Sequence, residues 1–142
     1  MKSFDDMVEE ERIREVSEDR ARAEDLSFRS RRRFKIQKDR EVSDFNSFEI
    51  LESVYEAIRE SIEASMAAEG WKSEDHVAAI SYADEKLGVS DATLNNLHRF
   101  RKPRNRSRYE ACEITQKEAE QILDVADSLI HDLPEKAEGN LR

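Results

Sequence analysis

The chain has 142 residues, of which 37% are hydrophobic and 40% are charged, so its few apolar side chains suit a few amphipathic helices better than a sheet core. It has 3 Gly and 2 Pro, too few turn residues for a sandwich or a barrel. No apolar run approaches the length of about 20 residues that a membrane span needs. The acidic N-terminus is unlike a signal peptide, and the single cysteine, Cys112, excludes an intrachain disulfide. We therefore expect an all-α, cytoplasmic protein that does not use a membrane.

The net charge of −9 is unevenly distributed along the chain. Residues 29–40 carry seven basic side chains and one acidic one, and residues 98–108 carry six basic side chains and no acidic one. Residues 1–28 and 41–70 are strongly acidic. Because local patches decide which partners bind, the overall negative charge does not exclude a nucleic acid.

The N-terminal part of the sequence predicts a charged arm. Apolar residues in 1–28 keep no steady helical period, and low hydrophobicity with high charge is typical of weak order, so this segment fits a highly charged helix or a disordered arm. Residues 29–40 resemble a basic linker. We therefore expect an arm over 1–42, a helical domain over 43–133 and a polar tail over 134–142.

A long amphipathic helix is predicted over 44–68. One stripe recurs at three- and four-residue steps and consists of Phe48, Leu51, Tyr55, Ile58 and Ile62. Gly70 suits the position just after a helix, and Trp71 is expected to fold back onto the core. The stripe fits a core face, and it also fits the seam of a homodimer.

A second helix is expected to begin at Ser73 as N-cap and to end at Gly88. Its expected buried face is Val77, Ile80, Ala83 and Leu87. Ser90 then caps a short helix over 91–99, whose inner face is Leu94, Leu97 and Phe100.

Two prolines are expected to end helices. Pro103 forbids a regular helix through its position, so residues 101–110 are expected to form a basic loop. The last helix begins at the capping box of Thr115 and Glu118 and is expected to end before Pro134.

Residues 80–99 resemble the helix-turn-helix of bacterial and phage DNA-binding regulators. Ala83 and Leu87 supply the inner face of the first helix, Gly88 the turn and Val89 the apolar plug. Ser90 is the cap of the second helix, and Leu94 and Leu97 are its inward residues, three apart. The same pattern also fits two ordinary helices joined by a glycine turn.

The wider segment 73–130 is similar to the lambda-repressor-like (Cro/C1, XRE) family. The resemblance rests on Arg101-Lys102-Pro103 after the second helix and on the apolar stripe over 122–129. Two positions depart from the family: Asp84 stands where a small alanine is usual, and Phe100 stands where a glycine is usual.

The resemblance implies a sequence-specific regulator of prokaryotic or phage type, with helix 91–99 in the major groove of double-stranded DNA. Asn pairs with adenine and Arg with guanine in that groove. The base-reading residues would be Ser90, Asp91, Ala92, Asn95, Asn96 and Arg99. The phosphate-binding residues in the loop 101–108 would be Arg101, Lys102, Arg104, Arg106 and Arg108.

The basic segment 29–40 is the candidate for a second contact. Its cations are Arg29, Arg31, Arg32, Arg33, Lys35, Lys38 and Arg40. They fit an arm that follows the DNA backbone, an arginine-rich segment that binds RNA, or a linker that neutralises the acidic residues of 1–28 or of helix 44–68.

The sequence holds no sign of an enzyme. The three histidines, His76, His98 and His131, are scattered, and no metal-binding spacing or phosphate-binding loop occurs. We expect no metal and no cofactor. The rival function is that of a small acidic protein of a mobile element that binds another protein or imitates DNA. The acidic N-terminus and the acidic face of helix 44–68, with Glu52, Glu56 and Glu60, would carry that role.

Overall fold

The computed structural model describes residues 3–109 and 114–140, and among them the side chains of residues 3–101 and 114–130. The elements in this part of the chain are α1 (Phe4–Glu9), β1 (Ile13–Glu15), α2 (Arg20–Lys38), α3 (Ser47–Glu69), β2 (Trp71–Ser73), α4 (His76–Lys86), α5 (Asp91–Tyr109) and α6 (Gln116–Asn140). The prediction of a mostly helical small domain is confirmed. None of the helices in these residues is long and apolar enough to cross a bilayer.

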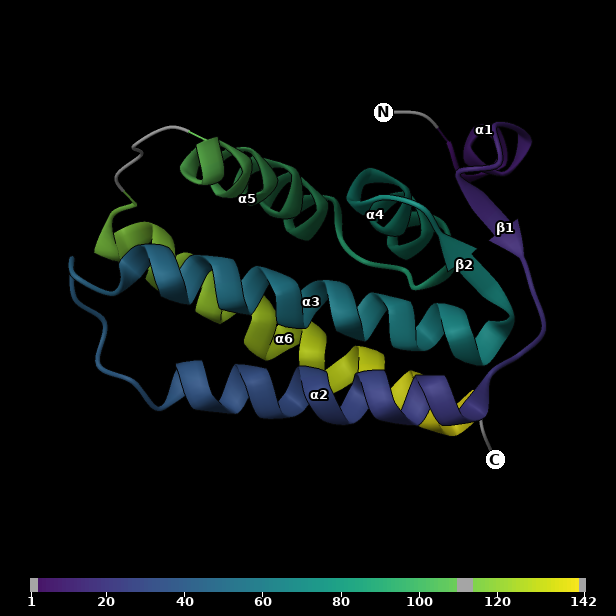
Figure 1. Cartoon of the computed structure of the whole chain (residues 1–142), viewed down its shortest axis with the longest axis horizontal. Coiled ribbons are helices and arrows are strands. Elements are labelled where there is room, and N and C mark those ends of the chain that lie inside the picture. Colours follow the sequence, from purple (N-terminus) through teal and green to yellow (C-terminus); the bar gives the residue numbers. More distant parts are fainter. Residues whose placement is uncertain (1–2, 110–113, 141–142) are drawn as a thin grey trace.

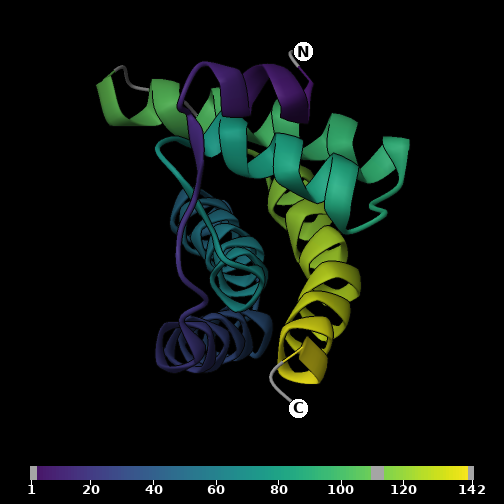
Figure 2. The same ribbon diagram turned by 90° about the vertical axis from the view of Figure 1, so that its right-hand side faces the viewer.

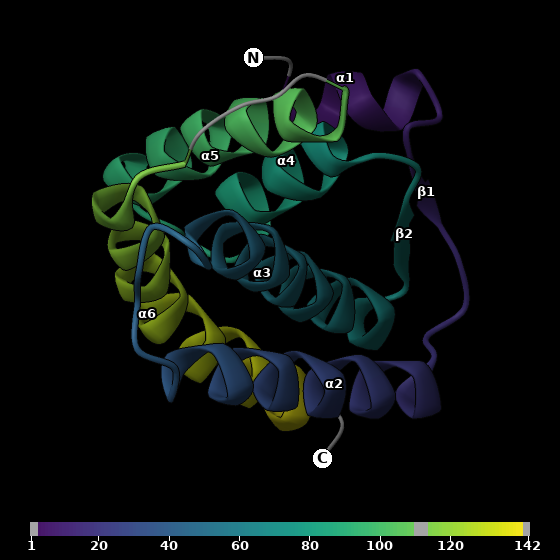
Figure 3. The ribbon, with the colours of Figure 1, turned by 60° about the vertical axis from the view of Figure 1, so that its left-hand side comes forward.

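Helix α3 forms the centre of the fold (Figure 1). Helix α2 packs along one side of it, and α1, α4 and α5 form a layer on the other side (Figure 2). Helix α6 packs against both α3 and α2 (Figure 3). As a result α3 is buried around almost its whole circumference, which accounts for its run of alanine, serine and aliphatic residues.

The predicted stripe of α3 is the core of a single chain. Leu51, Tyr55, Ile58 and Ile62 are buried, and Phe48 is half-buried against the same cluster. The chain's own helices cover these side chains. The stripe therefore serves as a core face, which is one of the two uses that its spacing predicts.

The end of α3 agrees with the sequence. Gly70 has φ +84°, the left-handed conformation predicted for a C-cap. Its carbonyl accepts a hydrogen bond of 2.8 Å from the N–H of Val16. Trp71 folds back onto the core and packs edge-on against Phe4, with 5.2 Å between the ring centroids.

A small antiparallel sheet joins the N-terminal segment to the middle of the chain. Its register pairs Ile13 with Ser73 and Glu15 with Trp71. Ile13 is fully buried, as is Met7 of α1. These strands were not predicted from the sequence, because at three residues each they are too short to show an alternating pattern.

The basic linker predicted over 29–40 is wrong, since residues 20–38 form α2. Phe34 of this helix lies in the same core cluster as α3 and α6. Most of the buried side chains of α2 are small or polar, and only two are large and apolar. The buried residues are Ala23, Leu26, Ser27, Ser30, Phe34 and Gln37. An apolar stripe is therefore hard to find in this segment, although the helix is packed.

Two predicted helix starts have different outcomes. Helix α4 is capped by Asp75, which accepts a hydrogen bond of 2.8 Å from the N–H of Ala78, and the predicted cap Ser73 lies instead in β2. The capping box of α6 is confirmed. The N–H of Glu118 donates to Oγ1 of Thr115 at 3.1 Å, and Oε1 of Glu118 accepts from the N–H of Thr115 at 3.3 Å.

Both prolines lie inside helices, contrary to the prediction. Helix α5 continues past Pro103 to Tyr109, so residues 101–109 are helical and do not form a basic loop. Helix α6 continues past Pro134 to Asn140. A proline removes one helical hydrogen bond and costs about 3 kcal/mol, a cost that good helix formers on either side, here mostly Arg, Lys, Glu and Ala, help to offset.

Candidate nucleic-acid interface

The segment that resembles a DNA-reading motif consists of α4, a short turn and α5. Gly88 in the turn has φ +63°, in the left-handed region. Val89 is half-buried and packs against the core, as predicted. Ser90 caps α5, because its Oγ accepts a hydrogen bond of 3.2 Å from the N–H of Thr93.

The inner side of this segment is closely packed. Leu94, Leu97 and Phe100 are buried on α5, and Ala83 is fully buried on α4. Asp84, which stands where the family usually has alanine, is exposed. The small residue that α4 buries is therefore the one directly before the position expected from the family.

The outward side of α5 carries five of the six predicted base-reading residues. Ser90, Asp91, Ala92, Asn95 and Arg99 are exposed, whereas Asn96 is half-buried. Arg99 is held in place by the neighbouring helix: its Nη2 donates to Oε1 of Gln121 on α6 at 2.9 Å. Its guanidinium also lies 4.7 Å from the centre of the Phe100 ring.

The predicted phosphate-binding residues follow on the same helix. Arg101 is half-buried, and its Nε has no acceptor among the described residues. Lys102, Arg104, Arg106 and Arg108 lie within α5, and their side chains are outside the described part of the chain. The same helix, α5, therefore carries the exposed Asn95 and Arg99 in its first half and a segment rich in basic residues in its second half.

The basic residues of 29–40 lie elsewhere. They belong to α2 or to the residues just after it, on the opposite side of α3 from α5 (Figure 1 and Figure 2). A DNA duplex bound to α5 would therefore not contact the outer side of α2.

At least four of the seven cations in 29–40 are in ion pairs with described residues. Arg33 contacts Glu60 at 2.8 Å and Arg40 contacts Glu49 at 3.0 Å, both on α3. Lys38 contacts Asp127 on α6 at 2.8 Å. Arg29 contacts Asp25 on α2 itself at 3.1 Å. For Arg33 and Arg40 the acid-neutralising interpretation is thus the one the contacts support.

Several acidic residues of α3 are in ion pairs with arginines and are not free. Glu60 is 4% exposed, and its carboxylate receives the Nε of Arg33. Arg59 contacts both Glu56 and Glu63. Burial raises the pKa of Glu63, although the positive charge of Arg59 opposes this.

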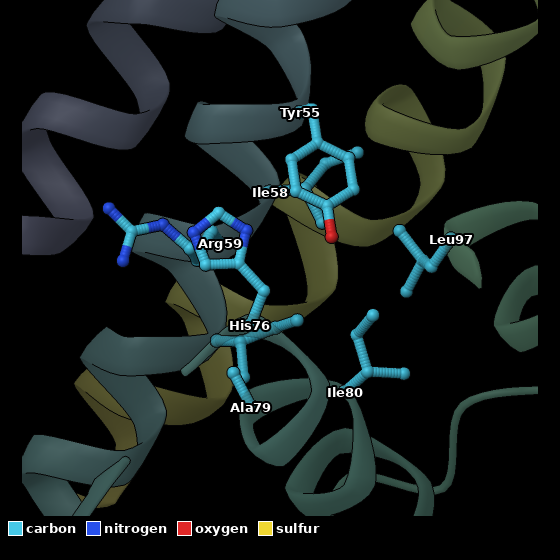
Figure 4. Close-up of a pocket in the computed structure, with 8 residues that line it drawn as sticks. Tyr55, Ile58, Arg59, His76, Ala79, Ile80 and Leu97 are labelled. Atoms are coloured by element: carbon cyan, nitrogen blue, oxygen red, sulfur yellow. The ribbon is translucent and has the colours of Figure 1, made fainter. Parts of the chain in front are cut away.

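A small pocket lies where α3 faces α4 and α5 (Figure 4). It is lined by Tyr55, Ile58, Arg59, Ile62, His76, Ala79, Ile80 and Leu97, and its volume of about 10 Å³ has room for one water molecule. The rings of Tyr55 and His76 stack with 5.7 Å between centroids. No sequence pattern predicts this pairing, because the two residues are far apart along the chain.

The pocket is too small to hold a substrate. Among the described residues no group of three or more His, Cys, Asp or Glu side chains is arranged to bind a metal ion. No protein family model matches the chain, and no curated protein matches its sequence.

Proposed function

We propose that this protein is a sequence-specific DNA-binding regulator, and that α4 and α5 act as a helix-turn-helix with the N-terminal half of α5 in the major groove. The observation that supports this best is the two-sided character of α5. Leu94 and Leu97 anchor it to the core, while Asn95 and Arg99 are presented outward on a helix capped by Ser90.

The chemistry of the outward face suits base edges. Asn95 can bond adenine N6 and N7 together, and Arg99 can bond guanine O6 and N7. Asn is a poor residue for the middle of an exposed helix, so its position there is explained if it contacts a ligand. Asp91 would accept from a cytosine amino group, and the N-terminal end of α5 favours a nearby phosphate.

The basic sequence of the same helix would add phosphate contacts. The helix has 19 residues and is about 28 Å long, so its basic second half extends well beyond the base-reading residues. Contacts of this kind make binding fall steeply with salt.

Arg99 must leave Gln121 before it can reach a base. This hydrogen bond is exposed, and such bonds contribute about 1 kcal/mol, which a guanine contact readily exceeds.

The test is a selection of bound fragments from randomised DNA across a salt series, with matched RNA as a control. We expect Asn95→Ala and Arg99→Ala to weaken binding to the selected sequence by about tenfold each and to relax the preference at one base position. Gln121→Ala removes the same hydrogen bond but keeps the arginine, and Arg20→Ala removes an exposed arginine from the far side. Arg20→Ala should leave binding unchanged, and Gln121→Ala should not weaken it, because Arg99 no longer has to give up this hydrogen bond.

The alternatives give different results. Binding without sequence preference would reduce α5 to a non-specific phosphate contact. Binding of RNA alone would support the RNA interpretation. The acidic-mimic interpretation has less support, because Glu60 is buried against Arg33; it predicts no nucleic-acid binding at all.

A further inference from the structure

A second exposed surface lies on α2, the helix on the far side of α3 from α5 (Figure 1 and Figure 2). We define the outer α2 face by Phe28, Arg32, Lys35 and Ile36. Phe28 is 63% exposed and Ile36 is 55% exposed, so this one helix holds two of the four large apolar side chains that are exposed among the described residues.

The cations on the outer α2 face are not used to hold α2 in place. Arg32 and Lys35 are exposed, and neither has an acidic partner among the described residues. In contrast, Arg33 and Lys38 tie α2 to α3 and α6. Arg32 and Lys35 therefore do not link α2 to the rest of the fold. They give the outer α2 face a local positive charge in a protein of net charge −9.

The spacing of the apolar residues suits a helical partner. Phe28 and Ile36 are eight residues apart, which is about 12 Å or two turns along α2. Two helices packed side by side bury residues at this spacing. A partner would need apolar residues opposite Phe28 and Ile36, and carboxylates opposite Arg32 and Lys35.

We propose that the outer α2 face docks an acidic amphipathic helix of a partner protein. The charge on the face selects an acidic partner over a basic one, and Phe28 and Ile36 supply the area that would become buried.

Two other occupants fit the face less well. A second copy packed antiparallel would bring the cations of residues 29–35 against their own counterparts. A nucleic acid would satisfy Arg32 and Lys35, but its phosphates would leave Phe28 and Ile36 uncovered, and an isoleucine offers no ring for a base to stack on.

The test uses the full chain and a fluorescent synthetic peptide of about 20 residues, with leucines at helical spacing and glutamates at the other positions. We expect saturable binding of this peptide and none of a peptide that has lysines in place of the glutamates. Phe28→Ala with Ile36→Ala, and separately Arg32→Glu with Lys35→Glu, should each weaken binding at least about tenfold. All four residues are exposed, so these variants should fold, which circular dichroism checks.

The matched control is Lys72→Glu with Lys117→Glu, which makes the same change of charge at exposed sites outside α2. It should leave the affinity within about twofold, and so should Asn95→Ala and Arg99→Ala on the opposite side. The proposal is thus independent of DNA binding by α5. It is overturned if the acidic peptide does not bind, or if the control weakens binding equally. It is also overturned if the Phe28 and Ile36 variant binds normally while RNA or anionic vesicles bind through Arg32 and Lys35.

Discussion

Glu60 is the one charged side chain that the fold buries among the described residues. Its carboxylate depends on Arg33, which lies 2.8 Å away and is itself partly exposed. We predict that Arg33→Met lowers the free energy of unfolding by about 1–3 kcal/mol, because Glu60 would be left buried without a partner. Arg32→Met, at the adjacent exposed position, should change it by less than about 0.5 kcal/mol. Urea denaturation measures both, and equal effects would mean that Glu60 finds water or another donor.

The two glycines with left-handed backbones provide a second comparison between single residues. A Cβ on Gly70 would lie 2.8 Å from the carbonyl oxygen of Val16, whereas a Cβ on Gly88 would meet nothing within 4 Å. Both alanine variants carry the cost of a left-handed conformation, about 1–2 kcal/mol. We predict that Gly70→Ala destabilises by at least about 1 kcal/mol more than Gly88→Ala, since backbone atoms must also move apart.

A chemical denaturation series on the two glycine variants tests this comparison. A similar loss of stability for both variants would show that residues 16–18 can move away from the end of α3 at little cost. DNA binding should also be measured for Gly88→Ala, since the turn before α5 sets the orientation of that helix.

At the scale of elements, Asp75 joins the N-terminal segment to α4. Its carboxylate caps α4 and accepts from Nε and Nη2 of Arg12 at 2.9 and 3.1 Å. Burial alone would raise the pKa of Asp75, but the hydrogen bonds from Arg12 and Ala78, together with the charge of Arg12, lower it below its ordinary 3.8. A lowered pKa in the folded state means that the charged form stabilises the fold above about pH 4, and that this contribution is lost as the pH falls further.

We predict that Asp75→Asn, which keeps the cap, lowers the free energy of unfolding by about 0.5–1 kcal/mol at pH 7, a modest value because both side chains are partly exposed to solvent. The difference from wild type should close as the pH falls below about 4. Asp19→Asn at the cap of α2 is the control, because its carboxylate has no arginine in an ion pair among the described residues. If Asp75→Asn lowers the free energy of unfolding by the same amount below pH 4, the effect comes from a change in packing or hydrogen-bond geometry and not from the lost charge.

The helices that could be predicted from sequence are those with strong local signals. Helix α3 shows an apolar stripe and has Gly70 as its C-cap, and α5 and α6 are capped at their N-termini by Ser90 and Thr115. Helix α2 could not be found in this way, because its buried side relies on contacts such as that of Ser30 Oγ with Ala57 O at 2.6 Å. Local rules also failed at Pro103 and Pro134, because α5 and α6 continue past these residues.

The candidate site was predictable only where it follows helical periodicity. The exposure of Asn95 and Arg99 and the burial of Leu94 and Leu97 follow from their spacing. The bond of Arg99 to Gln121 and the distance of α2 from α5 depend on tertiary packing, which no local pattern in the sequence encodes.

On the scale of the whole molecule, the first 42 residues are part of one core. Phe4, Met7, Ile13 and Phe34 lie in the same cluster as the buried side chains of α3, α4, α5 and α6. Removing these residues would expose the side of α3 that α2 covers and the side of α4 that α1 covers. The loss includes four large apolar side chains, each of which contributes about 1.5–3 kcal/mol when buried, against a total stability of about 5–15 kcal/mol.

We therefore predict that a fragment over 43–142 does not fold cooperatively, even though it contains the whole candidate DNA-binding segment. Its thermal unfolding followed by circular dichroism should lack the sigmoidal transition of the full chain, and it should bind the dye ANS through exposed apolar surface. Adding a synthetic peptide over 1–42 should restore the transition, because the lost contacts are the ones this peptide supplies. A fragment that melts cooperatively near the temperature of the full chain would instead establish 43–142 as an independent domain. In that case the first 42 residues would be an attached arm, as their composition suggests, and DNA binding by α5 could be studied without them.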